Sequence, residues 1–358
     1  MGRRESPLKT ILRQRFYFLF EILIIFLGIF IFMLIPTFLL PFLIDSSSVI
    51  FEPLYYLVRA TIIVVAIPLF LYISYFIMEK QRKILILDED ISPSRNFLNL
   101  FKITRSNFKF QLLYGILLLF LIFIPLDFLV YLFIPEMLDY ISTGLDTAGE
   151  FSLNSYFINE NYMIFLVSVI LIPLCVAIYE ESLTRGFLTN RGSDYFNKMS
   201  AVIITSFFFG LGHFAYIINP SSSDLPIIYP FLWFLQTFLV GIILSMIVLR
   251  KHWIFPVIFA HAVNNFITSH SIRNNLLGID FSIMTFYVYI PLSIIGIILF
   301  IWQFSLIKES LSIGWKEFKS YFARDDNIGE ETLDTIVRIM MDFLFGLLIW
   351  LVGIIILS

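Results

Sequence analysis

Long apolar stretches alternate with short polar connections along almost the whole chain. Nine runs close to the length of a bilayer contain few charged residues: 16–43, 54–78, 110–134, 162–184, 200–218, 230–249, 253–269, 282–304 and 339–357. A helix needs about 20 apolar residues to cross the hydrocarbon core of a bilayer. The pattern therefore predicts an all-α fold, a polytopic transmembrane bundle of eight or nine helices. The last run is either an appended anchor or a helix that lies against the bundle.

The composition is typical of a membrane protein. Hydrophobic residues make up 59% of the 358 residues and charged residues 14%, whereas a soluble domain carries about 25% charged residues. The single cysteine, Cys175, excludes an intrachain disulfide and a cysteine cluster for metal. We expect membrane lipid around the chain and no nucleic acid as a partner.

Lysine and arginine are distributed unevenly between the connections. If all nine runs span, 22 of the 24 lie on the side of the N-terminus, and only Arg59 and Arg273 lie on the other. Because basic residues favour the cytoplasmic side, we expect a cytoplasmic N-terminus. The protein is then integral and multi-pass, with a prokaryotic plasma membrane favoured over a eukaryotic endomembrane. Residues 308–338 mix apolar and charged positions and form either an interfacial amphipathic stretch or a solvated connector.

Three charged residues lie at the end of the fourth apolar run. They are Glu180, Glu181 and Arg185. A charge at bilayer depth costs about 2.5 to 3.5 kcal/mol on insertion scales, and such residues usually face a protein interior or an aqueous cavity. Glu181 and Arg185 are four residues apart on a helix, so they share a face and can form an ion pair. Glu180 is then the freer carboxylate.

Two histidines interrupt later runs. His213 lies in the fifth run, and His261 lies in the seventh, four residues before Asn265. At 1.5 Å per residue, Glu180 lies roughly 8 Å, His261 roughly 12 Å and His213 roughly 20 Å from the cytoplasmic ends of their runs. One shared cavity therefore requires helix tilt, a later start of the fifth span, or a bend in it.

These residue types suit the activation of water. A carboxylate in a low-dielectric cavity is a usable base near neutral pH, and a neighbouring histidine can hold the water. A second histidine and an asparagine can donate hydrogen bonds to the oxyanion of a tetrahedral intermediate. Each group also has a structural interpretation, because buried ion pairs and polar contacts commonly join helices in membranes. Ser182 has no adjacent base of the kind that activates a serine nucleophile.

The residues form three ordered motifs: Glu-Glu-x-x-x-Arg at 180–185, Phe-x-x-x-His at 209–213 and His-x-x-x-Asn at 261–265. They resemble the motifs of the CAAX protease and bacteriocin-processing (CPBP, or ABI) intramembrane peptidases, which include the type II CAAX prenyl endopeptidases. The resemblance covers 162–269, under a third of the chain.

The resemblance implies a catalytic core of four helices in residues 162–270. Three spans and their loops in 1–161 precede it, and the spans and amphipathic connector in 271–358 follow it. It also implies that Glu180 and His213 activate water, that His261 and Asn265 form the oxyanion site, and that Glu181 and Arg185 support them.

The resemblance leaves cofactor and substrate open. The sequence has no His-Glu-x-x-His pair, so we favour a glutamate peptidase that needs no cofactor. The alternative is a zinc peptidase in which Glu180, His213 and His261 bind the metal. The substrate would be a membrane-associated peptide end, prenylated or not, cut near the cytoplasmic face. Two other functions are a non-catalytic protein, such as a bacteriocin self-immunity factor or scaffold, and a transporter. A transporter that works by a proton relay would have its titratable groups on more helices than the three runs that carry them here.

Overall fold

The computed structural model describes residues 6–46, 48–79, 91–147, 161–214, 226–326 and 328–357, and these contain helices and no strand. The all-α class is therefore confirmed. The α-helices, and the π-helical segments written η, are α1 (Pro7–Leu43), α2 (Phe51–Ile77), α4 (Pro93–Asn99), α5 (Phe108–Leu118), η1 (Leu119–Phe123), α6 (Ile124–Phe133), α7 (Glu136–Thr147), α9 (Tyr162–Glu181), η2 (Ser182–Thr189), α10 (Asn190–Tyr195), α11 (Lys198–Phe214), α12 (Ile228–Lys251), α13 (Phe255–Leu276), α14 (Phe281–Met284), η5 (Thr285–Tyr289), α15 (Ile290–Trp302), α16 (Phe304–Ser320) and α17 (Thr332–Leu357).

Seven helical segments of the described chain are long and apolar enough to cross a membrane. They correspond to the first four, the sixth, the eighth and the ninth predicted runs. The fifth run forms α11, which is apolar but has 17 described residues. The seventh forms α13, whose polar residues lower its hydropathy over 22 residues. The polytopic helix bundle expected from the sequence is confirmed.

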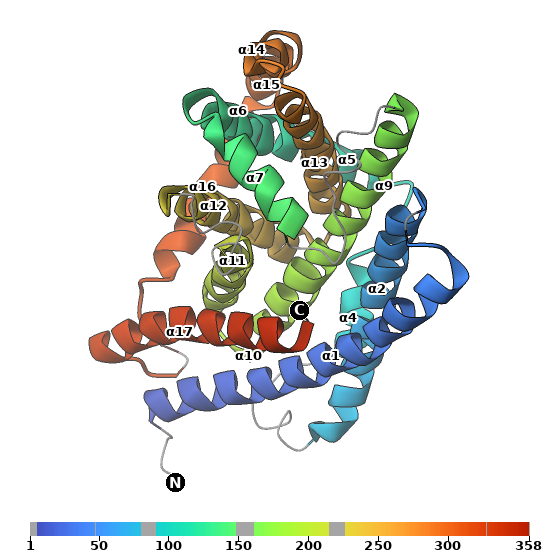
Figure 1. Cartoon of the computed structure of the whole chain (residues 1–358). Coiled ribbons are helices and arrows are strands. Elements are labelled where there is room, and N and C mark those ends of the chain that lie inside the picture. Colours follow the sequence, from blue (N-terminus) through green and yellow to red (C-terminus); the bar gives the residue numbers. More distant parts are fainter. Residues whose placement is uncertain are drawn as a thin grey trace.

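The bundle is built around pairs of packed helices (Figure 1). Helix α9 packs against α2 and α13, and α11 packs against α12 and α17. Helix α1 runs beside α2 and α17, so the first and last helices of the chain lie next to each other (Figure 1). The three helices that carry the predicted motifs, α9 with η2, α11 and α13, therefore lie inside the bundle.

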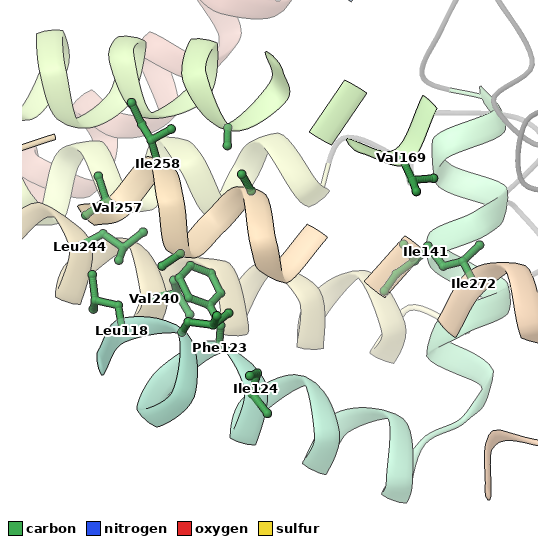
Figure 2. Close-up of a cluster of buried hydrophobic side chains, with 14 of the residues drawn as sticks. Leu118, Phe123, Ile124, Ile141, Val169, Val240, Leu244, Val257, Ile258 and Ile272 are labelled. Atoms are coloured by element: carbon green, nitrogen blue, oxygen red, sulfur yellow. The ribbon is translucent and has the colours of Figure 1, made fainter. Parts of the chain in front are cut away.

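An apolar cluster fixes the third span against the motif-bearing helices. Figure 2 shows Leu118 and Phe123 of this span near Val240 of α12 and Val257 of α13. Gly115 allows the close approach, because a Cβ atom there would lie 2.8 Å from the Phe259 ring. Helices in lipid associate mainly through such packing and through interhelical hydrogen bonds.

Buried ion pairs attach the outer helices. Arg191 Nε in α10 donates to Glu21 Oε2 in α1 at 2.9 Å, and both side chains are buried. Arg15 in α1 donates to Asp342 in α17, and the Tyr321 hydroxyl donates to the other Asp342 oxygen at 3.1 Å. Helix α17 therefore lies against the bundle. Helix α16 has no buried residue, and its location at a membrane surface stays a prediction.

Candidate active site

One cavity of about 390 Å³ brings the predicted site residues together. Its lining includes five of them: Glu180, Glu181, His213, His261 and Asn265. The sixth, Arg185, is fully buried. On straight helices His213 would lie deeper than the other site residues. In the structure it nevertheless lines the same cavity as they do.

Glu181 and Arg185 form the expected ion pair. Arg185 Nη1 lies 3.2 Å from Glu181 Oε1, and neither side chain is exposed. Helix α9 ends at Glu181 and continues as the π-helical segment η2, a conformation often found at functional sites. The Arg185 guanidinium also lies 4.2 Å from the ring centroid of Phe209, the first residue of the second motif. This cation–π contact explains why an aromatic side chain suits that position.

His261 lies beside both glutamates. Its Nδ1 is 2.8 Å from Glu181 Oε1, and its Nε2 is 3.8 Å from Glu180 Oε2. The Glu180 side chain is 24% exposed, whereas Glu181 is 0% exposed. Glu180 is therefore the freer carboxylate, and it opens into the cavity. The imidazole also stacks on Phe123, with the centroids 6.1 Å apart.

His213 reaches the cavity from a different helix, α11. Its Nδ1 lies 3.0 Å from the Phe209 carbonyl oxygen, which can only accept a hydrogen bond. This contact assigns the proton to Nδ1 and leaves Nε2 without it in the neutral ring. The ring packs against Trp233, with the centroids 5.0 Å apart. Among the described residues, the imidazole within 4 Å of the Glu180 carboxylate is that of His261 and not that of His213.

Comparison with known proteins identifies this region. Residues 162–267 match the family model described as type II CAAX prenyl endopeptidase Rce1-like. They are a CAAX protease domain of the Rce1-like family. No curated protein and no solved structure matches the chain. The family expected from the three motifs is confirmed for residues 162–267, and at the family level this match supports an intramembrane CAAX-type protease. The division into 1–161, 162–270 and 271–358 stays a prediction.

Two charged residues outside the Rce1-like domain also line the cavity. They are Arg59 of α2 and Asp127 of α6. The Arg59 guanidinium lies 4.7 Å from the ring centroid of Tyr179, the residue before Glu180. Asp127 is 4% exposed and accepts hydrogen bonds from side chains of α12 and α13. Each is the one charged residue in its apolar run, a signal that could have identified both from the sequence.

The described side chains do not form a ready zinc site. Among them, no group of three or more His, Cys, Asp and Glu is placed to hold a metal ion. Glu180 and His261 approach each other, but His213 has no contact with either that would complete a three-ligand set. A catalytic zinc ion needs three such ligands at about 2 Å. We therefore derive no catalytic step through a metal.

Proposed function

We propose that the chain is an intramembrane endopeptidase that hydrolyses a peptide bond with a water molecule activated by Glu180. One observation carries this proposal: Glu180, the more accessible of the two adjacent glutamates, lies in a cavity beside His261, and His213 and Asn265 line the same cavity. A general base must lie within reach of the proton that it removes, and Glu180 is the carboxylate that opens into the cavity.

In the proposed reaction, Glu180 takes a proton from the water, and the water oxygen bonds to the carbonyl carbon of the peptide. His213 orients the water through its Nε2. The carbonyl electrons move onto oxygen and form a tetrahedral oxyanion, to which His261 and Asn265 donate hydrogen bonds. Glu180 then returns the proton to the peptide nitrogen as the C–N bond breaks. The products are one new carboxylate and one new amine.

Glu181 and Arg185 support the donor groups in this mechanism. Glu181 Oε1 accepts from His261 Nδ1 at 2.8 Å, which holds the ring so that Nε2 faces the cavity. In its doubly protonated form His261 donates from both nitrogens, and the two carboxylates surround the positive charge. Arg185 keeps the buried Glu181 charge paired. A carboxylate that holds a histidine in this way is the usual device for fixing its tautomer.

The proposed substrate is a membrane-associated peptide or protein end, prenylated or not. The aromatic and aliphatic lining of the cavity, which includes Phe123, Ile172 and Trp233, suits an apolar chain next to the scissile bond. The distribution of basic residues supports a cytoplasmic N-terminus and cleavage near the cytoplasmic face. We propose that the reaction needs no cofactor.

The test is a comparison of membrane-protein termini in cells that lack the gene. The cells are complemented with wild type, with Glu180→Gln, or with Glu309→Gln as a control at an exposed acid. Termini that appear with wild type and Glu309→Gln but not with Glu180→Gln would support the proposal and identify the substrate. If all three proteins restore the phenotype and no terminus differs, the chain acts as a non-catalytic membrane protein and the proposal is wrong.

A further inference from the structure

Asp127 is a third carboxylate of the cavity and comes from outside the Rce1-like domain. It lies in the middle of an apolar span, where an ionised group is costly, and it is 4% exposed. None of the residues that the structure describes forms an ion pair with it. A buried charge without a neighbouring cation is stabilised only by hydrogen bonds. The carboxylate of Asp127 therefore requires hydrogen-bond donors around it.

Three neutral side chains supply these hydrogen bonds. Gln236 Nε2 of α12 donates to Asp127 Oδ1 at 2.6 Å. From α13, Asn264 Nδ2 and Thr268 Oγ1 donate to Oδ2 at 2.8 Å and 3.0 Å. Hydrogen bonds to an ionised carboxylate are about twice as strong as those between neutral groups. Asp127 therefore joins three helices, α6, α12 and α13, at one point.

On α13 the two donors lie on either side of a predicted catalytic residue. Asn264 and Thr268 are four residues apart, so they lie one above the other on a single face. Asn265 follows Asn264 directly, within the turn that the two bonds span. Phe123 lies one turn before Asp127 in the third span, and His261 lies one turn before Asn264 in α13. The rings of Phe123 and His261 stack on each other. The third span thus contacts successive turns of α13, and these contacts fix the rotation of α13 about its axis.

On α12, the hydrogen bond between Gln236 and Asp127 lies close to the contact that packs this helix against His213. Gln236 is three residues after Trp233, so the two side chains lie on one face of α12. The Trp233 ring packs on the His213 ring, with the centroids 5.0 Å apart. Through Gln236, Asp127 is therefore connected to the face of α12 that packs against His213. Through Asn264 and Thr268, it is connected to the turn of α13 that carries Asn265.

We propose that Asp127 is a positioning residue that holds α12 and α13 in the arrangement in which His213, His261 and Asn265 face Glu180. This inference rests on the proposed function, because it assigns a role in the same reaction. Asp127 accepts three hydrogen bonds from neighbouring helices and is almost fully buried, so it acts through the helices and not by contact with the substrate. The third span thereby becomes part of the active site although it precedes the family match.

The first experiment measures kcat and KM of Asp127→Asn in proteoliposomes with a quenched fluorescent peptide library. The amide keeps the size of the side chain but removes the charge and turns one acceptor into a donor. We expect kcat to fall about 10- to 100-fold while KM changes less than about 2-fold, because small displacements of catalytic groups affect mainly the chemical step. Thr268→Val, which removes one donor and keeps the carboxylate, should give a smaller loss of kcat.

The matched control is Asp139→Asn. The exposed Asp139 carboxylate likewise accepts a hydrogen bond from an asparagine of α13, Asn275, at 2.6 Å near the C-terminal end of the helix. Neither residue is part of the cavity lining. If kcat of Asp127→Asn stays within about 2-fold of that of the control, a purely structural role is sufficient and the inference is wrong.

The second experiment does not need turnover. Cys175 is the single cysteine, so Cys175→Ala provides a background in which Asn265→Cys reports on the cavity. We expect a small maleimide to label this reporter about 10-fold faster when Asp127→Asn is added, because the turn that carries it is released, and no faster with Asp139→Asn. An equal or slower rate with Asp127→Asn would overturn the inference. If labelling accelerates but wild type and Glu180→Gln show no difference in turnover, the proposed function fails and the positioning role stands.

Discussion

Oε1 of Glu181 is shared by two partners, with His261 Nδ1 at 2.8 Å and Arg185 Nη1 at 3.2 Å. The arginine lies one turn away on the same helical segment, whereas the histidine comes from a helix 80 residues further along the chain. One buried oxygen therefore connects the first and third motifs. The more exposed Glu180 remains available for chemistry.

Replacement of Glu181 by glutamine should lower activity without abolishing folding. The amide oxygen can still accept hydrogen bonds, but the negative charge that stabilises Arg185 and His261 is lost. We expect kcat to fall about 10²-fold, the cost of a small misplacement of a catalytic group. The measurement is kcat of the purified, reconstituted variant beside Glu309→Gln. Wild-type kcat in Glu181→Gln would contradict the orienting role.

Removal of Arg185 should affect stability more than Glu181→Gln does. Arg185→Gln removes the arginine that pairs with the buried Glu181 carboxylate, and breaking a buried ion pair in this way costs about 3 to 5 kcal/mol. Phe209→Leu keeps an apolar side chain but removes the cation–π contact, worth about 0.5 to 2 kcal/mol, together with the ring contacts to His213 and His261, and it should destabilise the protein less than Arg185→Gln. Thermal unfolding in detergent, followed by loss of the monodisperse fraction, ranks the variants. A Phe209→Leu protein less stable than Arg185→Gln would contradict this order.

The buried pair between Arg15 and Asp342 should hold the last span to the first. Asp342→Asn leaves Arg15 buried without a carboxylate, so we expect a destabilisation of about 3 to 5 kcal/mol. Limited proteolysis should then cut the connection before α17 sooner than in wild type. Tyr321→Phe, which removes one hydrogen bond to Asp342, should cost only about 1 kcal/mol and serves as the milder variant. Equal proteolysis of wild type and Asp342→Asn would show that packing alone attaches α17.

Chelators should not inhibit the reconstituted enzyme. The described side chains do not form a three-ligand set, so we expect well below one zinc ion per chain by elemental analysis. Activity should stay within about 2-fold after dialysis against a chelator, whereas a zinc-dependent site loses its catalytic water with the metal. About one zinc ion per chain, with activity lost on chelation and restored by zinc, would contradict the cofactor-free mechanism.

Much of the fold could be predicted from the sequence because the bilayer imposes a simple rule of length and apolar character. The pairing of Glu181 with Arg185 was also predictable, since it depends only on helical spacing. The cavity that the site residues share was harder to predict, because the depth of His213 depends on how its helix packs and not only on its position along a straight helix.

Other features of the site depend on contacts between distant segments. Nothing in the sequence of Ser182–Thr189 signals a π-helix. The contact of His261 with both glutamates requires the relative rotation of α9 and α13, which spacing does not give. Asp127 and Arg59 could have been singled out as lone charges in apolar runs, but their partners could not, because these lie on other helices.

The turnover of purified Glu180→Gln tests the central claim most directly. Wild type, Glu180→Gln and Glu309→Gln are reconstituted in the same vesicles and given the same peptide library, and cleavage is followed by fluorescence and mass spectrometry. Loss of a general base typically lowers the rate about 10²- to 10⁴-fold, so Glu180→Gln should fall by this factor while Glu309→Gln keeps the wild-type rate. Wild-type turnover by a folded, membrane-inserted Glu180→Gln protein would contradict the account.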